Sequence, residues 1–183
     1  IQRNDGEWHV EETWPSNDIE WTTHDASEWG SLGIVSSSSS ITLTSSPLES
    51  NYHISGLPTF HAQVNANSCN GGQLFVTMSD GTTGLRLGHA TMDLRYRDGG
   101  YEAKSVTPFS SYTMLMQFNP MDVIIPEGHT IQLEIAESGE DYLSSTCASA
   151  GITLNGEQPL SLPLIDRESS DGRWFEVPPW WEE

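Results

Sequence analysis

Several segments of the chain alternate apolar and polar residues with a period of two. In the segment TFHAQVNAN, residues 59–67, the apolar residues are Phe60, Ala62, Val64 and Ala66. Successive side chains of an extended strand point to opposite faces, so this spacing predicts a strand with one buried face and one polar face. The same alternation occurs in QLFVTMSD, RLGHATMDLRYRDGG, YTMLMQFNP and HTIQLEIAE, which are residues 73–80, 86–100, 112–120 and 129–137.

The alternation also predicts which side chains enter the core. The residues expected to point inward are Leu74, Val76, Met78, Met92, Leu94, Tyr96, Ile131, Leu133 and Ile135. Turns are expected at Asp80-Gly81 and at residues 98–100, where glycine adopts the positive φ that tight turns need. No stretch of 12 or more residues has a helical period. This pattern predicts an all-β protein built from two packed antiparallel sheets.

The length of 183 residues fits one domain, and seven Trp, 16 Gly and 10 Pro are typical of a folded, turn-rich β protein. We expect a single domain over residues 1–183, with an N-terminal segment (1–35), a serine-rich loop (36–40), a core sandwich (41–165) and a tail (166–183). The loop SSSSS has nothing to bury and is interpreted as a mobile surface loop. The tail contains WFEVPPWWEE, which either folds over the sandwich or begins a linker or contact surface.

The charge balance is strongly acidic. The chain has 26 acidic residues against seven basic ones, of which only Lys104 is a lysine, and its formal charge is −19. Nucleic acid is excluded as an expected partner because phosphate binding needs a basic surface, and anionic membranes are disfavoured for the same reason. Such a surface indicates a saline environment or bound cations, or it serves solubility alone.

Targeting signals and cysteines bear on where the protein works. No run of about 18 apolar residues occurs, so no membrane span is predicted. The N-terminus lacks a signal-peptide pattern, and we interpret the chain as a piece of a longer protein. Cys69 and Cys147 fit one disulfide closing a long loop, or two free thiols. We favour the disulfide and an extracellular or cell-surface location, with a cytoplasmic location as the alternative.

Motifs for nucleophilic catalysis are absent from the sequence. An α/β-hydrolase nucleophile needs the motif G-x-S-x-G, and residues 30–33, Gly-Ser-Leu-Gly, are the nearest match with the wrong spacing. The six histidines are scattered, without metal-ligand spacing, at positions His9, His24, His53, His61, His89 and His129. No catalytic residue is predicted.

Hard-cation sites have only isolated candidates. His24, Asp25 and Glu28 lie close together and suggest a metal site, but a solvated loop with capping side chains is the favoured interpretation. Calcium is conceivable at Asp98 or Asp80, although no EF-hand spacing surrounds them. The metal candidates are therefore Asp98, Asp80 and Asp25, and no other cofactor is expected.

Five stretches, in order, resemble a known family. They are QRNDGEWHVEETWP, SSPLESNYHISGLPTFHAQVNAN, QLFVTMSDGTTGLRLGHATMDLRYRD, VIIPEGHTIQLEIAES and LSLPLI, and they span about residues 2–165. Together they resemble the C-terminal non-catalytic domain of X-Pro dipeptidyl-peptidases and cocaine-esterase-like serine hydrolases, the S15 peptidase group. The resemblance implies a galactose-binding-like jelly-roll β-sandwich. It also implies an α/β-hydrolase catalytic domain in the same parent chain, which holds the Ser-Asp-His triad.

The resemblance assigns structural roles to residues of these stretches, namely Gly56, Pro58, Gly88, Gly128 and His129. By position alone, His129 is either catalytic or marks the start of a buried strand. The family has a Gly-His pair at the start of a core strand, so the resemblance implies a structural role, with the ring bonded to neighbouring loop backbone. An arginine often follows this histidine in the family, but Thr130 stands here, and a salt bridge made by that arginine is not expected.

Three functions follow from these considerations. The first is an accessory domain that supports the catalytic domain of a peptide- or ester-cleaving serine hydrolase and shapes access to its pocket. The second is a carbohydrate-binding or calcium-dependent adhesive module, for which exposed tryptophans among Trp8, Trp14, Trp21 and Trp29 would stack on sugars unless they pack in the core. The third is a released structural subunit that forms oligomers through exposed strand edges.

Overall fold

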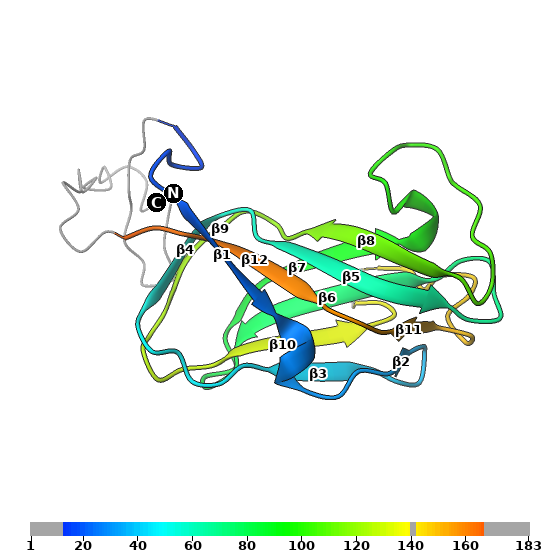
Figure 1. The fold of residues 1–183 in the computed structure, drawn as a ribbon, viewed down its shortest axis with the longest axis horizontal. Helices are drawn as coiled ribbons and strands as arrows, with labels where there is room; N and C mark the ends of the chain where they lie inside the picture. The colour runs from blue at the N-terminus through cyan, green and yellow to red at the C-terminus, as the bar shows by residue number, and fades with distance from the viewer. Residues whose placement is uncertain (1–12, 140–141, 167–183) are drawn as a thin grey trace, which may run out of the picture.

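The computed structural model describes residues 13–139 and 142–166, and nearly all their regular structure is β (Figure 1). The elements of the described residues are β1 (Glu20–Asp25), η1 (Ala26–Trp29), β2 (Ile34–Val35), β3 (Ile41–Thr44), β4 (Tyr52–Gly56), β5 (Thr59–Ala66), β6 (Gln73–Asp80), β7 (Arg86–Asp93), η2 (Leu94–Tyr96), β8 (Ser111–Gln117), β9 (Met121–Ile125), β10 (Ile131–Ala136), β11 (Ile152–Leu154) and β12 (Pro159–Leu164). The labels η1 and η2 denote short 3-10 helices. The tail falls outside the described residues except for Asp166.

The large sheet contains eight strands arranged in four rows of two collinear strands. The rows are β1 with β2, β12 with β11, β4 with β5, and β9 with β8, and each row pairs antiparallel with the next. On the two middle rows, Leu164 faces Ile54, Leu160 faces Phe60 and Leu154 faces Val64, so β12 and then β11 run along β4 and β5.

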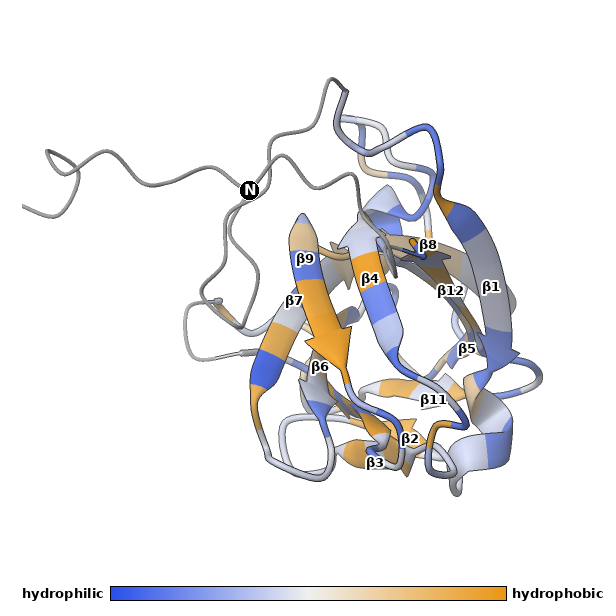
Figure 2. Ribbon diagram, turned by 90° about the vertical axis from the view of Figure 1, so that its left-hand side faces the viewer, coloured by the Kyte–Doolittle hydropathy of each residue, from blue (hydrophilic) through white to orange (hydrophobic). Residues whose placement is uncertain are grey.

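The small sheet has the strand order β3-β10-β6-β7 and packs against the large sheet. Figure 2, in which β4 and β9 face the viewer, shows β1, β12 and β8 on one side of the core and β3 on the other. Two four-row antiparallel sheets enclosing one core form the predicted jelly-roll sandwich, in which β1 and β2 come from the N-terminal segment. Phe60 and Met114 of one sheet and Met78 and Leu133 of the other are completely buried. Burying side chains of this size contributes about 1.5 to 3 kcal/mol each.

Residues 86–100 differ in part from the expected continuous strand. Strand β7 ends at Asp93, whose carboxylate accepts a hydrogen bond from the backbone N–H of Arg95 at 2.8 Å and caps η2. Leu94 is fully buried as predicted, but Tyr96 is 38% exposed. The prediction that Tyr96 points inward is wrong because the 3-10 turn replaces the period of two.

The two ends of the sandwich differ in character. At the loop end, on the right of Figure 1, long connections meet, namely residues 36–40, 67–72, 94–110 and 142–151. At the hairpin end, short turns join β6 to β7 and β9 to β10, and Glu20 pairs with Leu164 near the described chain ends. The serine-rich loop lies at the surface, where Ser36 and Ser39 exchange backbone hydrogen bonds of 2.8 and 3.2 Å. Among the described residues, no helix is long and apolar enough to cross a membrane.

Candidate functional site

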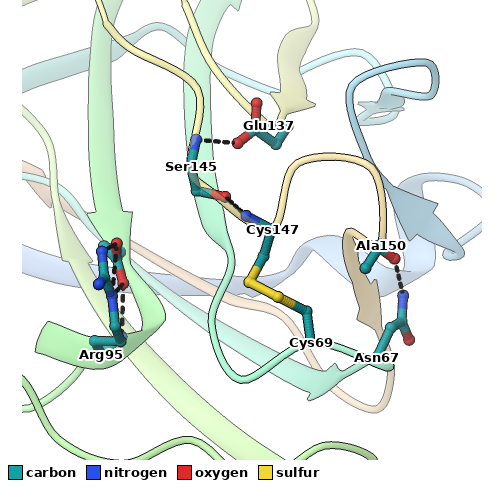
Figure 3. Close-up of a disulfide and its surroundings, with 8 residues drawn as sticks. Asn67, Cys69, Arg95, Glu137, Ser145, Cys147 and Ala150 are labelled. Atoms are coloured by element: carbon teal, nitrogen blue, oxygen red, sulfur yellow. Dashed lines mark hydrogen bonds and ion pairs between the residues drawn. A yellow bond between two sulfur atoms is a disulfide. The ribbon is translucent and has the colours of Figure 1, made fainter.

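A disulfide between Cys69 and Cys147 fastens the loop end (Figure 3). It joins the β5–β6 connection to the β10–β11 connection across 78 residues, with the two Cα atoms 5.8 Å apart. Cys147 is buried, and the chain has no free cysteine. In the chain-entropy account, closing a loop of this length stabilises the fold by about 4 to 5 kcal/mol.

Hydrogen bonds hold the loops around the disulfide (Figure 3). The backbone N–H of Ser145 donates to Glu137 Oε1 at 2.6 Å, and the backbone N–H of Cys147 donates to Ser145 Oγ at 3.2 Å. The side-chain amide of Asn67 donates to the carbonyl of Ala150 at 2.8 Å. These contacts hold residues 145–150 of the β10–β11 connection against the neighbouring loops.

A small polar cavity of about 80 Å³ lies beside the disulfide. It is lined by Asn70, Gly71, Gly72, Asp93, Arg95, Ser145 and Thr146. Arg95 donates to both carboxylate oxygens of Asp93, at 3.0 Å from Nε and 2.6 Å from Nη2, and these bonds and the Asp93 charge raise the pKa of Arg95. Since the two charges satisfy each other, the cavity suits a water molecule or a small neutral group.

A wider, open cavity of about 340 Å³ lies against the serine-rich loop. Its lining consists of Ser36–Ser40 together with Glu134, Ala136, Glu137 and Ser138. Hydroxyl and carboxylate oxygens suit a hydroxyl-rich ligand, but no aromatic side chain lines this cavity. The stacking platform that usually accompanies a sugar site is therefore missing from its walls.

His129 and Gly128 lie in the turn before β10, at the hairpin end. The Nδ1 atom of His129 is 2.8 Å from Oδ2 of Asp80, and the main chain around Gly128 and His129 exchanges hydrogen bonds of 2.9 and 2.8 Å with Leu48. The ring thus contacts a side chain and not, as expected, loop backbone. Thr130 closes the same turn through its backbone, since its carbonyl accepts from the N–H of Gly81 at 2.8 Å.

Asp80 is the centre of this turn. It accepts hydrogen bonds from the N–H of Thr82 at 2.9 Å and the hydroxyl of Thr83 at 2.7 Å, besides His129. Burial acts to raise the pKa of Asp80, but the hydrogen bonds from Thr83, His129 and Thr82 outweigh it, and the pKa is lowered. The carboxylate is therefore ionised and fully engaged within the protein.

The three remaining motif residues lie where the strands bend or cross. Gly56 has φ +145°, and a Cβ atom there would lie 3.0 Å from the ring of Pro163. The carbonyl of Pro58 accepts from the N–H of Phe118 at 2.9 Å, across the bend between the rows. At Gly88, a Cβ atom would lie 2.6 Å from Met121 Cε, where β7 approaches β9. The missing side chain at Gly88 lets β7 of the small sheet approach β9 of the large sheet closely.

The metal candidates do not form one site. Asp98 pairs with Lys104 in the β7–β8 connection, Asp80 lies at the hairpin end, and Asp25 accepts from the N–H of Ser27 at 2.9 Å and of Gln158 at 2.8 Å. His24 approaches the hydroxyl of Tyr52 at 3.4 Å. Across residues 13–139 and 142–166, no three His, Cys, Asp or Glu side chains gather in a way that could hold a metal ion.

Comparison with known families decides what kind of domain this is. Residues 17–170 match the family described as the X-Pro dipeptidyl-peptidase C-terminal non-catalytic domain. The chain belongs to this family. A search of curated proteins found no match.

Solved structures share the fold of this family member at low sequence identity. An aminopeptidase from a marine sediment Thaumarchaeota archaeon is 11% identical, with a TM-score of 0.64 over 89% of this chain and 39% of its own. A CocE/NonD family hydrolase from Staphylococcus aureus is 11% identical, with a TM-score of 0.62 over 90% and 40%. An α-amino acid ester hydrolase is 12% identical, with a TM-score of 0.59 over 85% and 35%. The chain thus spans about two fifths of the length of these proteins.

The described histidines agree with membership of a non-catalytic family. Two of them pair with aspartates, His129 with Asp80 and the buried His53 with the buried Asp122, and neither ring bonds a serine hydroxyl. Neither pair is the serine–histidine contact that an activated nucleophile requires. Sequence reasoning missed the His53–Asp122 pair. The available signal was a charged residue within the apolar run MDVII, residues 121–125.

Proposed function

We propose that this domain is the accessory domain of an X-Pro dipeptidyl-peptidase-like serine hydrolase, where it supports an α/β-hydrolase catalytic domain and shapes access to its pocket. The observation that carries the proposal is the family match over residues 17–170. The rigid sandwich supports it, because a disulfide-fastened β-sandwich is suited to buttressing a neighbouring domain. The family description, which names a non-catalytic domain, supports chemistry that is carried out by a separate catalytic domain.

The same proposal extends to location and cofactors. We propose an extracellular or cell-surface location, supported by the Cys69–Cys147 disulfide, since such bonds persist in oxidising compartments.

We also propose that the domain works without a cofactor, because Asp25, Asp80 and Asp98 are all bound to protein groups. If so, a chelator leaves the thermal midpoint of the isolated chain unchanged, whereas a calcium site would lower it on chelation.

Hydrolysis assays test the central proposal. The 183-residue chain should not cleave an Ala-Pro anilide or a simple ester, whereas the complete product of the natural gene should cleave one of them. The substitution His129→Ala in the complete product should leave the rate of hydrolysis unchanged, apart from any loss of protein stability. Hydrolysis by the 183-residue chain that disappears with His129→Ala would refute the non-catalytic assignment.

A carbohydrate ligand is the second candidate, favoured by the serine-lined cavity of about 340 Å³. Its hydroxyl and carboxylate groups match the hydrogen-bonding groups of a sugar. A glycan array probed with the 183-residue chain tests it, with Glu134→Ala as the variant, since Glu134 is an exposed member of the lining. Binding that Glu134→Ala abolishes supports this function, and an array without binding rejects it.

A further inference from the structure

The outer face of the large sheet carries no charged side chain on β5, on β8 or at the neighbouring positions of β11 and β12. The outward residues of β5 are Thr59, His61, Gln63 and Asn65. Those of β8 are Ser111, Thr113, Leu115 and Gln117. Thr153 of β11 and Ser161 of β12 continue the same face on the next row. No Asp, Glu, Lys or Arg occurs at any of these positions.

This neutrality contrasts with the rest of the chain, which has 26 acidic residues. The central strand β10 of the small sheet, for comparison, exposes Glu134 on its outer side. Of the carboxylates on the large sheet, Asp25 at the end of β1 is bound to the backbone of Ser27 and Gln158, and Asp122 of β9 is buried against His53. Depletion of charge is the compositional signal of the centre of a protein interface.

Exposed apolar side chains lie at opposite sides of this neutral region. Leu115 is 50% exposed on β8, directly opposite His61. Trp21 is 54% exposed on β1, opposite Pro163, and Ile34 is 52% exposed on β2. No Asp, Glu, Lys or Arg lies between them, so a second protein surface can cover this part of the sheet without burying such a charge. Figure 1 shows β1, β12, β5 and β8 side by side in this layer.

We propose that this neutral face, made of the outward residues of β5, β8, β11 and β12 with Trp21 and Ile34, docks against the catalytic domain of the same polypeptide. The inference rests on the proposed function, because it names the contact surface for that partner. The similar structures leave about three fifths of their own chains outside the match, which is ample protein to cover a sheet. A second copy of this chain is disfavoured as the occupant, since each copy carries a charge of −19 and the two would repel.

Hydroxyl-radical footprinting tests the docking face with a matched pair of leucines. Leu115 on the neutral face and Leu85 in the β6–β7 turn are 50% and 48% exposed. We expect Leu115 to be oxidised several-fold more slowly in the complete gene product than in the 183-residue chain. Leu85 should be oxidised at the same rate in both.

The substitutions Leu115→Glu and Leu85→Glu provide the second measurement. In the complete gene product, Leu115→Glu should separate the unfolding of the two domains into two transitions, because it buries a charge in the contact. Leu85→Glu should leave one transition, as in the wild type. In the 183-residue chain both variants should unfold at nearly the same temperature, since both sites are exposed.

Each contrary outcome has a distinct meaning. If the complete gene product contains a catalytic domain and Leu115 is oxidised at the same rate in both proteins, the docking face is wrong and the proposed function is unaffected. A complete gene product without a catalytic domain overturns the proposed function itself. If Leu115 is oxidised more slowly in the 183-residue chain than in a chain ending at Asp166, the tail covers the neutral face. If the oxidation of Leu115 becomes slower as the protein concentration rises, a second copy of the chain covers it. Either result overturns the proposal.

Discussion

His129 and Asp80 join two turns that lie 49 residues apart in the chain, through a contact of 2.8 Å between Nδ1 and Oδ2. The carboxylate also holds the backbone of its own turn through Thr82 and Thr83. One side chain therefore fixes both the β6–β7 turn and the approach to β10.

Replacing Asp80 by Ala should destabilise the domain by about 2 to 3 kcal/mol, because it leaves several donors without an acceptor in a buried site. The measurement is urea unfolding of the 183-residue chain at neutral pH. Asp98→Ala is the matched control, since Asp98 forms an exposed ion pair with Lys104 and its loss should leave the free energy of unfolding nearly unchanged. Equal losses from the two variants would show that the Asp80 turn is not a stabilising centre.

Acid should weaken the same turn. The hydrogen bonds to Asp80 lower its pKa below the usual 3.8, so the folded state binds this proton less readily than the unfolded state. The stabilisation is complete above the unfolded pKa and is lost as the pH falls through the lowered folded value. Unfolding free energies measured between pH 7 and pH 2 should decline more steeply below about pH 4 for the wild type than for Asp80→Asn. Parallel declines would contradict this assignment.

Removing the disulfide should cost about 4 to 5 kcal/mol, since the closed loop restricts the unfolded chain. The variant is the double substitution Cys69→Ser with Cys147→Ser, compared with the reduced wild type by thermal unfolding. Both should lose stability by a similar amount, because both remove the same covalent constraint. A reduced wild type as stable as the oxidised protein would mean that native strain cancels the entropic gain.

Gly88→Ala should destabilise the domain by about 1 to 3 kcal/mol through overpacking. The added Cβ atom would lie 2.6 Å from Met121 Cε and 3.0 Å from Asn119 Oδ1, which accepts the N–H of His89 at 2.7 Å. Gly33→Ala is the control, because nothing lies within 4 Å of a Cβ atom there. Calorimetry should show a lower melting temperature for Gly88→Ala only.

The strands could be predicted wherever the alternation is regular. Ile131, Leu133 and Ile135 are completely buried as the period of two predicts. The prediction failed at Tyr96, because the Asp93 carboxylate caps a 3-10 turn by a local hydrogen bond that hydrophobic spacing does not encode. Propensity and pattern thus specify where strands run, while side-chain capping decides where they stop.

The polar contacts could not be predicted because they depend on register between distant strands. His53 meets Asp122 only because β4 pairs with β9 so that Ser55 faces Asp122. For the same reason, the sequence alone left two alternatives for Cys69 and Cys147, a disulfide or two free thiols. The family resemblance supplied the structural role of His129, but its Asp80 partner required the three-dimensional arrangement.

The pairing of Glu20 with Leu164 sets the order in which the domain can be made. Strand β1 leaves the ribosome early, but its neighbour β12 is among the last described segments to emerge. The first row of the large sheet must therefore wait for nearly the whole domain to be translated before it gains a partner. Such non-local pairing is typical of slow folding, on the order of milliseconds to seconds. Nascent chains will thus expose an unpaired β1 edge during synthesis, when chaperones have the greatest opportunity to act.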